Sequence, residues 1–181
     1  MSTSDIGSGN HRTPGATTQV LPAHSGGRRS AAKEDAFLRC RRYRSDHRLF
    51  AVVDPALGRI MLEVGSVGAV VMPAALGAKV RELLTGPQRC PIIAHPRSDR
   101  WTFLTGPTDN SYLDMGLFAD LFRVCASIAL PGSRIVLPSP ADERTGYRSW
   151  VDAPDDDYRP DLAEVTGVTR TTAAAPRYGV N

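Results

Sequence analysis

The sequence predicts a single domain of the α/β (α+β) class, in which a mixed β-sheet is covered by about three helices. Between residues 32 and 167, short apolar stretches typical of strands alternate with segments whose apolar residues recur at helical spacing, without a regular βαβ repeat. Hydrophobic residues make up 41% of the 181 residues, enough for a buried core. We therefore expect a domain over residues 32–167, a disordered basic tail over residues 1–31, and a C-terminal tail over residues 168–181.

The first expected element is a helix over residues 32–45. The residues before it are mostly Ser, Thr, Gly and Pro with hardly any large apolar side chain, so they cannot offset the entropy cost of ordering. Within the helix, Ala36, Cys40 and Tyr43 share one face at helical spacing, and the arginines lie elsewhere. This pattern predicts a helix that packs on the domain through one narrow face.

Basic charge is concentrated at the N-terminal end of the chain. Residues 1–48 hold nine Arg and Lys against four Asp and Glu, whereas the remaining 133 residues hold thirteen against fifteen. Such an asymmetry is typical of an arm that binds phosphates, although an arginine-rich helix can equally be a solvated surface. The candidate contacts of this arm are Arg39, Arg41, Arg42 and Arg44.

The strands are predicted from short apolar runs bounded by turn residues. The first two runs are separated by Asp54-Pro-Ala-Leu-Gly58 and a later pair by Pro96-Arg-Ser-Asp99, both typical of turns. The runs on either side of Pro131-Gly132 are expected to pair with each other, and a last strand follows an acidic loop. The expected strands cover residues 49–53, 59–64, 67–72, 91–95, 100–105, 126–130, 134–137 and 147–151.

Two further helices are predicted between these strands. One begins at Pro73, because proline fits the first turn of a helix, and ends before Gly86. The other covers residues 111–124, where Ser111 and Asp114 form a capping pair at its start. Its leucines and phenylalanines form a wide apolar stripe, which indicates a core helix.

No self-sufficient catalytic or metal-binding set is evident. Cys40, Cys90 and Cys125 contain no C-x-x-C pair and are expected to be reduced core thiols. The sequence has no G-x-S-x-G nucleophile elbow and no glycine-rich phosphate loop backed by a lysine. The dense acidic cluster at residues 155–157 is flanked by prolines, which is typical of a surface loop. We expect no catalytic residue, no metal and no cofactor, and a function that is not enzymatic.

Secretion and membrane insertion are not indicated. The longest apolar runs contain glycine or proline and are far shorter than the ~20 residues that a membrane helix needs. The N-terminus is rich in Ser, Thr and Gly and does not show a charged start followed by an apolar stretch. We expect a cytoplasmic protein.

Two strands place an arginine close to a tryptophan, in Arg100-Trp101 and in Arg148-Ser-Trp150. Such pairs suit stacking on nucleobases and contact with phosphates, but tryptophans on the strands of a small domain are also typical core residues. Because side chains alternate along a strand, we expect each arginine on the face opposite its tryptophan. Stacking and phosphate contact would then not share one face.

Three stretches together resemble the bifunctional DNA primase/polymerase domains, which are related to the archaeo-eukaryotic primases. Residues 36–53 resemble the family's opening helix and strand, and residues 97–107 (RSDRWTFLTGP) resemble its central strand. Residues 132–150, with GSRIVLPSP and then GYRSW, are similar to the family's terminal hairpin. The likeness is greatest to short standalone relatives in high-GC bacteria, and it spans about residues 36–165.

The departures from that family bear directly on function. Its active members use a strand ending in Asp-x-Asp/Glu, a later Ser-x-His and a further acid, but here the corresponding strand ends in Met72-Pro73 and Trp101 replaces the histidine. Without those carboxylates, two Mg²⁺ ions have no ligands. The resemblance therefore implies a catalytically degenerate domain that binds nucleic acid or nucleotide in an accessory role in DNA or RNA metabolism. Its expected contacts are Arg97, Arg100, Ser139 and Arg148. The alternative is a protein-interaction or regulatory module that kept the fold without the ligand.

Overall fold

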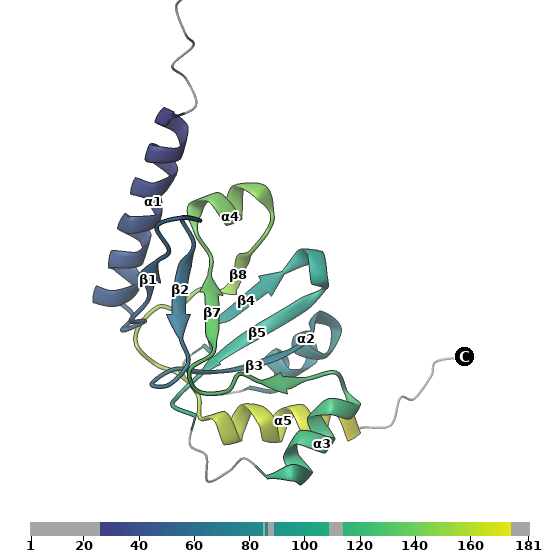
Figure 1. The fold of residues 1–181 in the computed structure, drawn as a ribbon. Coiled ribbons are helices and arrows are strands. Elements are labelled where there is room, and N and C mark those ends of the chain that lie inside the picture. The colour runs from purple at the N-terminus through teal and green to yellow at the C-terminus, as the bar shows by residue number, and fades with distance from the viewer. Residues whose placement is uncertain (1–25, 85, 87–88, 109–113, 175–181) are drawn as a thin grey trace, which may run out of the picture.

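The computed structural model describes residues 26–84, 86, 89–108 and 114–174. Within these residues there are five α-helices and eight strands. The strands form two β-sheets, and the helices lie on the outside (Figure 1). The elements in chain order are α1 (Gly26–Ser45), β1 (Val52–Val53), β2 (Ile60–Glu63), β3 (Gly68–Pro73), α2 (Ala74–Leu83), β4 (Ile92–His95), the 3-10 turn η1 (Pro96–Ser98), β5 (Arg100–Thr105), α3 (Met115–Arg123), β6 (Ser127–Ile128), β7 (Arg134–Leu137), α4 (Pro140–Thr145), β8 (Ser149–Asp152) and α5 (Leu162–Ala174). The α/β class expected from the sequence is confirmed.

The strands divide into a small sheet and a larger one. The small sheet has the order β1-β2-β7, and the larger sheet has the order β6-β3-β5-β4-β8. All the strand pairs among the described residues are antiparallel. The centre of the larger sheet is the β4–β5 hairpin, which is closed by η1 and by Asp99 in the left-handed conformation (φ 50°).

Two apolar cores lie on opposite faces of the larger sheet. Alternation along the strands sends Ile93 and Leu104 toward the small sheet and α1, and sends Ile92 and Phe103 toward the helices. The second core is completed by apolar residues of α2, α3 and α5, of which Val165 of α5 is fully buried. The molecule therefore has three layers, with α1 and the small sheet on one side of the larger sheet and three helices on the other.

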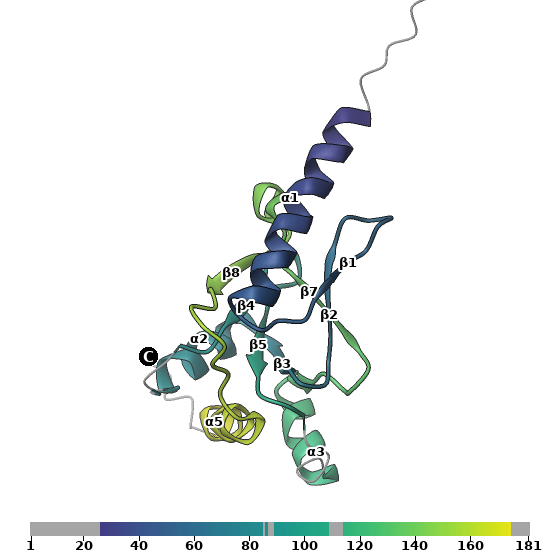
Figure 2. The same cartoon turned by 90° about the vertical axis from the view of Figure 1, so that its left-hand side faces the viewer.

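Helix α1 lies beside β1, and its first half extends beyond the sheets (Figure 2). As the sequence predicts, it packs through Ala36, Cys40 and Tyr43, which are all buried. Tyr43 donates a hydrogen bond from its hydroxyl to Pro138 O (2.8 Å) and accepts one from Trp150 Nε1 (2.8 Å). These bonds tie α1 to β8 and to the segment before α4.

The strands on either side of Pro131-Gly132 do not pair with each other, so that expectation is wrong. β6 pairs with β3 in the larger sheet, whereas β7 pairs with β2 in the small sheet. Gly132 (φ +81°) donates to Val64 O at this point, and the chain passes from one sheet to the other. A two-residue turn looks like a hairpin in the sequence, but the partners of both strands are distant in the chain.

The boundaries of the domain also differ from those expected. Helix α1 begins at Gly26, so residues 26–31 are helical rather than part of a disordered tail; residues 1–25 lie outside the described residues. At the other end, α5 continues to Ala174, well past the expected boundary at residue 167. Its threonines are compatible with burial because their hydroxyls donate to carbonyls one turn earlier, as Thr169 does to Val165 O (2.7 Å). A Thr- and Ala-rich stretch resembles a tail in the sequence, and only its burial against the sheet reveals the helix.

The expected core helix at residues 111–124 is observed as α3, in a shorter form. Its N-cap is Asp114, whose side chain accepts a hydrogen bond from Leu117 N (2.7 Å), and the expected partner Ser111 lies outside the described residues. Leu117 and Leu121 are buried, but Phe122 is 82% exposed, so the core-facing stripe of α3 is narrower than expected. No helix among the described residues is long and apolar enough to cross a membrane.

Candidate functional site

A cleft of about 320 Å³ opens between the two sheets, where β7 faces β3, β4 and β5. Among the residues that the structure describes, its charged side chains are all basic, and no Asp or Glu contributes to its lining. The lining consists of Val71, His95, Ser98, Arg100, Thr102, Ala129, Arg134, Ile135, Val136 and Arg148. A concave site with several cations and no carboxylate suits an anionic ligand.

The β4–β5 hairpin places three of these side chains on one face. His95 is paired with Arg100 across the hairpin, and His95 Nε2 lies 2.8 Å from Thr102 Oγ1. Trp101 projects to the opposite face and packs on Gly77 of α2. The expectation that Arg100 and Trp101 lie on opposite faces is therefore confirmed.

Arg100 is held by main-chain carbonyls rather than by a carboxylate. Its Nη2 donates to Cys125 O (2.7 Å) and to Val71 O (3.3 Å). Carbonyl oxygens fix the guanidinium in place without cancelling its charge. Arg100 thus contributes a positioned cation to the cleft.

Arg148 forms another wall of the cleft and is largely buried, with 15% of its side chain exposed. Its Nη1 lies 3.3 Å from Asp142 Oδ1, and its Nε is buried with no hydrogen-bond partner among the described residues. A buried donor without an acceptor costs free energy, which a ligand oxygen at this position would recover.

The sequence expectation placed Arg148 opposite Trp150, but both face the small sheet, because residues two apart on a strand share a face.

The rim next to Arg148 carries a tyrosine between two arginines. The Arg97 guanidinium carbon lies 4.2 Å from the centroid of the Tyr147 ring, and that of Arg148 lies 5.2 Å from it. These cation–π contacts hold Arg97 beside the cleft while leaving its charge intact. Arg97, Arg100 and Arg148, named separately from the sequence, are thus gathered in one region of the surface.

His95 is the titratable group with a perturbed pKa in this cleft. Its half-buried position disfavours the charged imidazolium, and the charges of Arg148 and Arg100 disfavour it further, so the pKa of His95 is lowered. The imidazole is therefore neutral near pH 7. An anion in the cleft would offset both effects and favour protonation of His95.

Several cleft residues were not singled out by sequence reasoning. His95, Thr102 and Arg134 come from three different strands, and Tyr147 follows the short helix α4, which the sequence analysis treated as a loop. An arginine at the start of a strand is unremarkable in sequence, so Arg134 gave no signal. Only the meeting of the two sheets brings these side chains together.

Ser139 does not belong to this site. It is 3% exposed and forms the N-cap of α4, where its Oγ accepts from Asp142 N (3.1 Å) in a reciprocal capping box. Its hydroxyl is also 2.8 Å from Asp142 Oδ2. We therefore assign Ser139 a structural role in ending β7 and starting α4.

The arginines of α1 are also not part of the cleft lining. Arg39 forms an ion pair with Glu143 of α4 (2.9 Å), whose hydrogen bond raises the pKa of the guanidinium. Arg44 donates to Ala51 O (3.0 Å), while Arg41 and Arg42 are exposed. Two of these four arginines thus hold α1 against the domain, and two face solvent.

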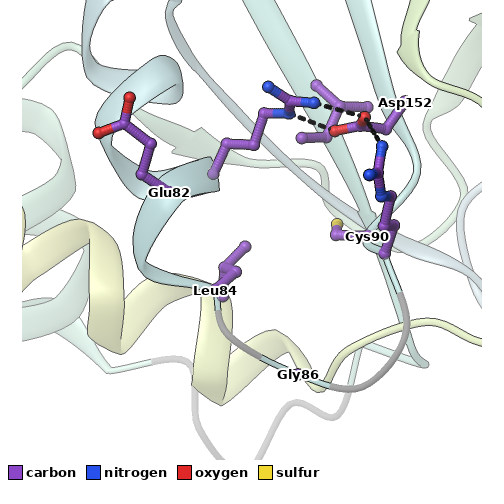
Figure 3. Close-up of a pocket in the computed structure, with 8 residues that line it drawn as sticks. Glu82, Leu84, Gly86, Cys90 and Asp152 are labelled. Carbon is purple, nitrogen blue, oxygen red and sulfur yellow. Dashed lines mark hydrogen bonds and ion pairs between the residues drawn. The ribbon is translucent and has the colours of Figure 1, made fainter.

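A second pocket, of about 270 Å³, lies between α2 and β8 (Figure 3). Its centre is Asp152, which is 7% exposed and accepts two hydrogen bonds from Arg81 (2.5 and 2.7 Å); Arg89 lies 3.5 Å away. Asp152 is thus already paired with two arginines of this pocket. Burial raises the pKa of the Cys90 thiol to about 12, so this cysteine is no nucleophile at neutral pH.

Metal ligands are not clustered in the part of the chain that the structure describes: no group of three or more His, Cys, Asp or Glu side chains there could hold an ion.

Comparisons with protein-family models, with curated proteins and with solved structures found no match to this chain. The resemblance to primase/polymerase domains therefore stays a prediction.

Proposed function

We propose that the protein binds a nucleotide or a nucleic-acid strand through its phosphates in the cleft between the two sheets. One observation carries this proposal: Arg100, Arg134 and Arg148 line the cleft, and no carboxylate lines it. Guanidinium groups are the side chains best suited to phosphate because they offer several donors in a planar fork.

The chemistry of the lining favours binding without catalysis. Nucleotidyl transfer needs Mg²⁺ ions held by carboxylates against the triphosphate, and the lining offers none. His95 is neutral near pH 7 and accepts or donates at Thr102, which suits a hydrogen bond to a ligand oxygen. An accessory role in DNA or RNA metabolism follows from this proposal and from the family resemblance.

A salt-titrated binding series tests the proposal. The full chain is titrated with a labelled mononucleotide, single-stranded DNA, duplex DNA and RNA at several salt concentrations. Each phosphate neutralised contributes a log–log slope of about −0.7 to −0.9, so Arg148→Gln should flatten the slope by about one and weaken binding roughly tenfold near ~100 mM salt.

The matched control is Arg123→Gln, which removes the same charge from α3, where Arg123 is 73% exposed and paired with Asp120. It should leave the affinity within a factor of about two. Unchanged melting temperatures would show that both variants fold. Equal losses for Arg148→Gln and Arg123→Gln, or no binding of any of these ligands near ~100 mM salt, would contradict the proposal.

A further inference from the structure

A groove of about 620 Å³ lies between α1 and β1, and exposed apolar side chains surround it. Phe37 of α1 is 54% exposed, Phe50 is 60% exposed and Val52 is 58% exposed, and all three line the groove. Large apolar side chains that gather at one groove with this exposure indicate a surface that is covered by a partner. Figure 2 shows that α1 and β1 lie side by side.

The main chain of β1 offers hydrogen bonds to an added strand. β1 is the edge of the small sheet and pairs only with β2 there. Asp54 N donates to Arg59 O across the β1–β2 turn, whereas Ala51 O points to α1 and accepts from Cys40 Sγ (3.3 Å) and Arg44 Nη1 (3.0 Å). Because the polar groups of successive residues point to alternate sides, the N–H and C=O of Val53 face away from β2, toward the groove that Val53 lines.

The charge of the groove selects among possible occupants. Arg41 and Arg44 stand on its α1 side, and no Asp or Glu of the described part of the chain lines it. An acidic segment would therefore be attracted to this rim. A second copy packed on the same surface by two-fold symmetry would instead bring the two sets of arginines together, which costs free energy.

The lining also favours a peptide over a nucleic-acid strand as the occupant of the groove. Six of the nine lining residues are apolar, namely Phe37, Cys40, Phe50, Ala51, Val52 and Val53. Alternate side chains of an extended peptide would enter such a groove while its main chain bonds to the strand edge, as in β-strand addition. A nucleic acid uses neither the strand edge nor the valines.

We propose that the groove between α1 and β1 binds an extended acidic peptide segment of a partner protein. Apolar side chains of the segment occupy the space between Phe37 and Phe50, its main chain pairs with Val53, and its acidic side chains contact Arg41 and Arg44. This site is separate from the arginine-lined cleft between the sheets, since the two linings share no residue.

The probe for the test is a fluorescein-labelled peptide of about ten residues in which valine or phenylalanine alternates with glutamate. Three such peptides, differing in the order of their apolar residues, are titrated into the full chain by fluorescence anisotropy. We expect saturable binding with a Kd below about 100 µM for at least one of them. The same peptide with lysine in place of glutamate, or with N-methylated alternate residues, should bind at least about tenfold more weakly.

Variants on the protein locate the site. Arg41→Glu and Phe50→Ala change exposed residues and should each weaken binding about tenfold. The matched control is Arg42→Glu, which makes the same charge change at a neighbouring exposed residue of α1 that does not line the groove, and it should change the Kd less than about threefold. The cleft variant Arg148→Gln should bind the peptide like wild type, so the two proposals can fail separately.

Three results would overturn this proposal. The first is that none of the peptides binds at about 1 mM. The second is that Arg41→Glu and Arg42→Glu weaken binding equally, which would indicate attraction to overall charge. The third is a different occupant whose binding depends on Phe50. Single-stranded DNA as that occupant would assign the groove to nucleic acid, and a dimer in sedimentation that Phe50→Ala dissociates would assign it to a second copy.

Discussion

Replacement of Gly77 by alanine tests how tightly α2 supports the strand that carries Arg100. Gly77 is buried on α2, and a Cβ there would stand 2.9 Å from Trp101 Cε3, 3.3 Å from Trp101 Cβ and 3.3 Å from Phe103 Cε2. Carbon atoms normally pack about 3.5–4.0 Å apart, so α2 would have to move away from β5. Alanine gains up to about 1 kcal/mol in helix propensity, while overpacking of a core costs about 1–3 kcal/mol.

We therefore expect Gly77→Ala to lower the free energy of unfolding by up to about 2 kcal/mol, or the melting temperature by up to roughly 6 °C. The control is Gly167→Ala on α5, where a Cβ meets nothing within 4 Å; this variant should be more stable than wild type by about 0.5–1 kcal/mol. Urea denaturation with a common m-value measures both. A Gly77→Ala protein as stable as Gly167→Ala would refute the close packing of α2 on β5.

Three further predictions follow from the titratable and paired groups. The pKa of His95 is lowered in the free cleft, and a bound anion would raise it. The affinity for single-stranded DNA, whose phosphodiesters do not titrate near pH 6, should therefore rise by up to about tenfold per pH unit as pH falls below about 6.5. His95→Gln should abolish this dependence in anisotropy titrations. The pKa of Cys90 is raised from 9.0 to about 12, so the contribution of its protonated thiol to the free energy of unfolding is present below pH 9 and is lost between pH 9 and 12. The Cys90→Ala protein should therefore lose stability less steeply at alkaline pH, and a stability profile like that of wild type would contradict this prediction. Asp152→Ala leaves Arg81 without its buried partner and should lower the free energy of unfolding by about 1–3 kcal/mol in thermal or urea unfolding. Asp120→Ala removes a carboxylate that is 30% exposed and pairs with Arg123 and Arg170 at the surface, and it should cost at most about 1 kcal/mol.

Local patterns in the sequence predicted the class of the fold and most of its elements. Hydrophobic periodicity located α2 and the buried face of α1, and short apolar runs located the β4–β5 hairpin around its Pro96–Asp99 turn. These features are encoded by neighbouring residues, because helix and strand periods and turn preferences act over a few positions. Arg100 and Arg148 were singled out for a similar local reason, because each lies close to a tryptophan on an expected strand, whereas Arg97 was named from the family resemblance.

Tertiary structure alone decided which strands pair and which side chains share a surface. β6 and β7 are close in sequence but belong to different sheets, since β6 pairs with β3 and β7 pairs with β2. That division creates the cleft: Arg134 enters it from the small sheet, and His95 and Arg100 enter it from the larger one. Tertiary structure also decided that Ser139 caps a helix and that α5 buries its threonines, since the role of a side chain depends on which distant residues exclude water from it.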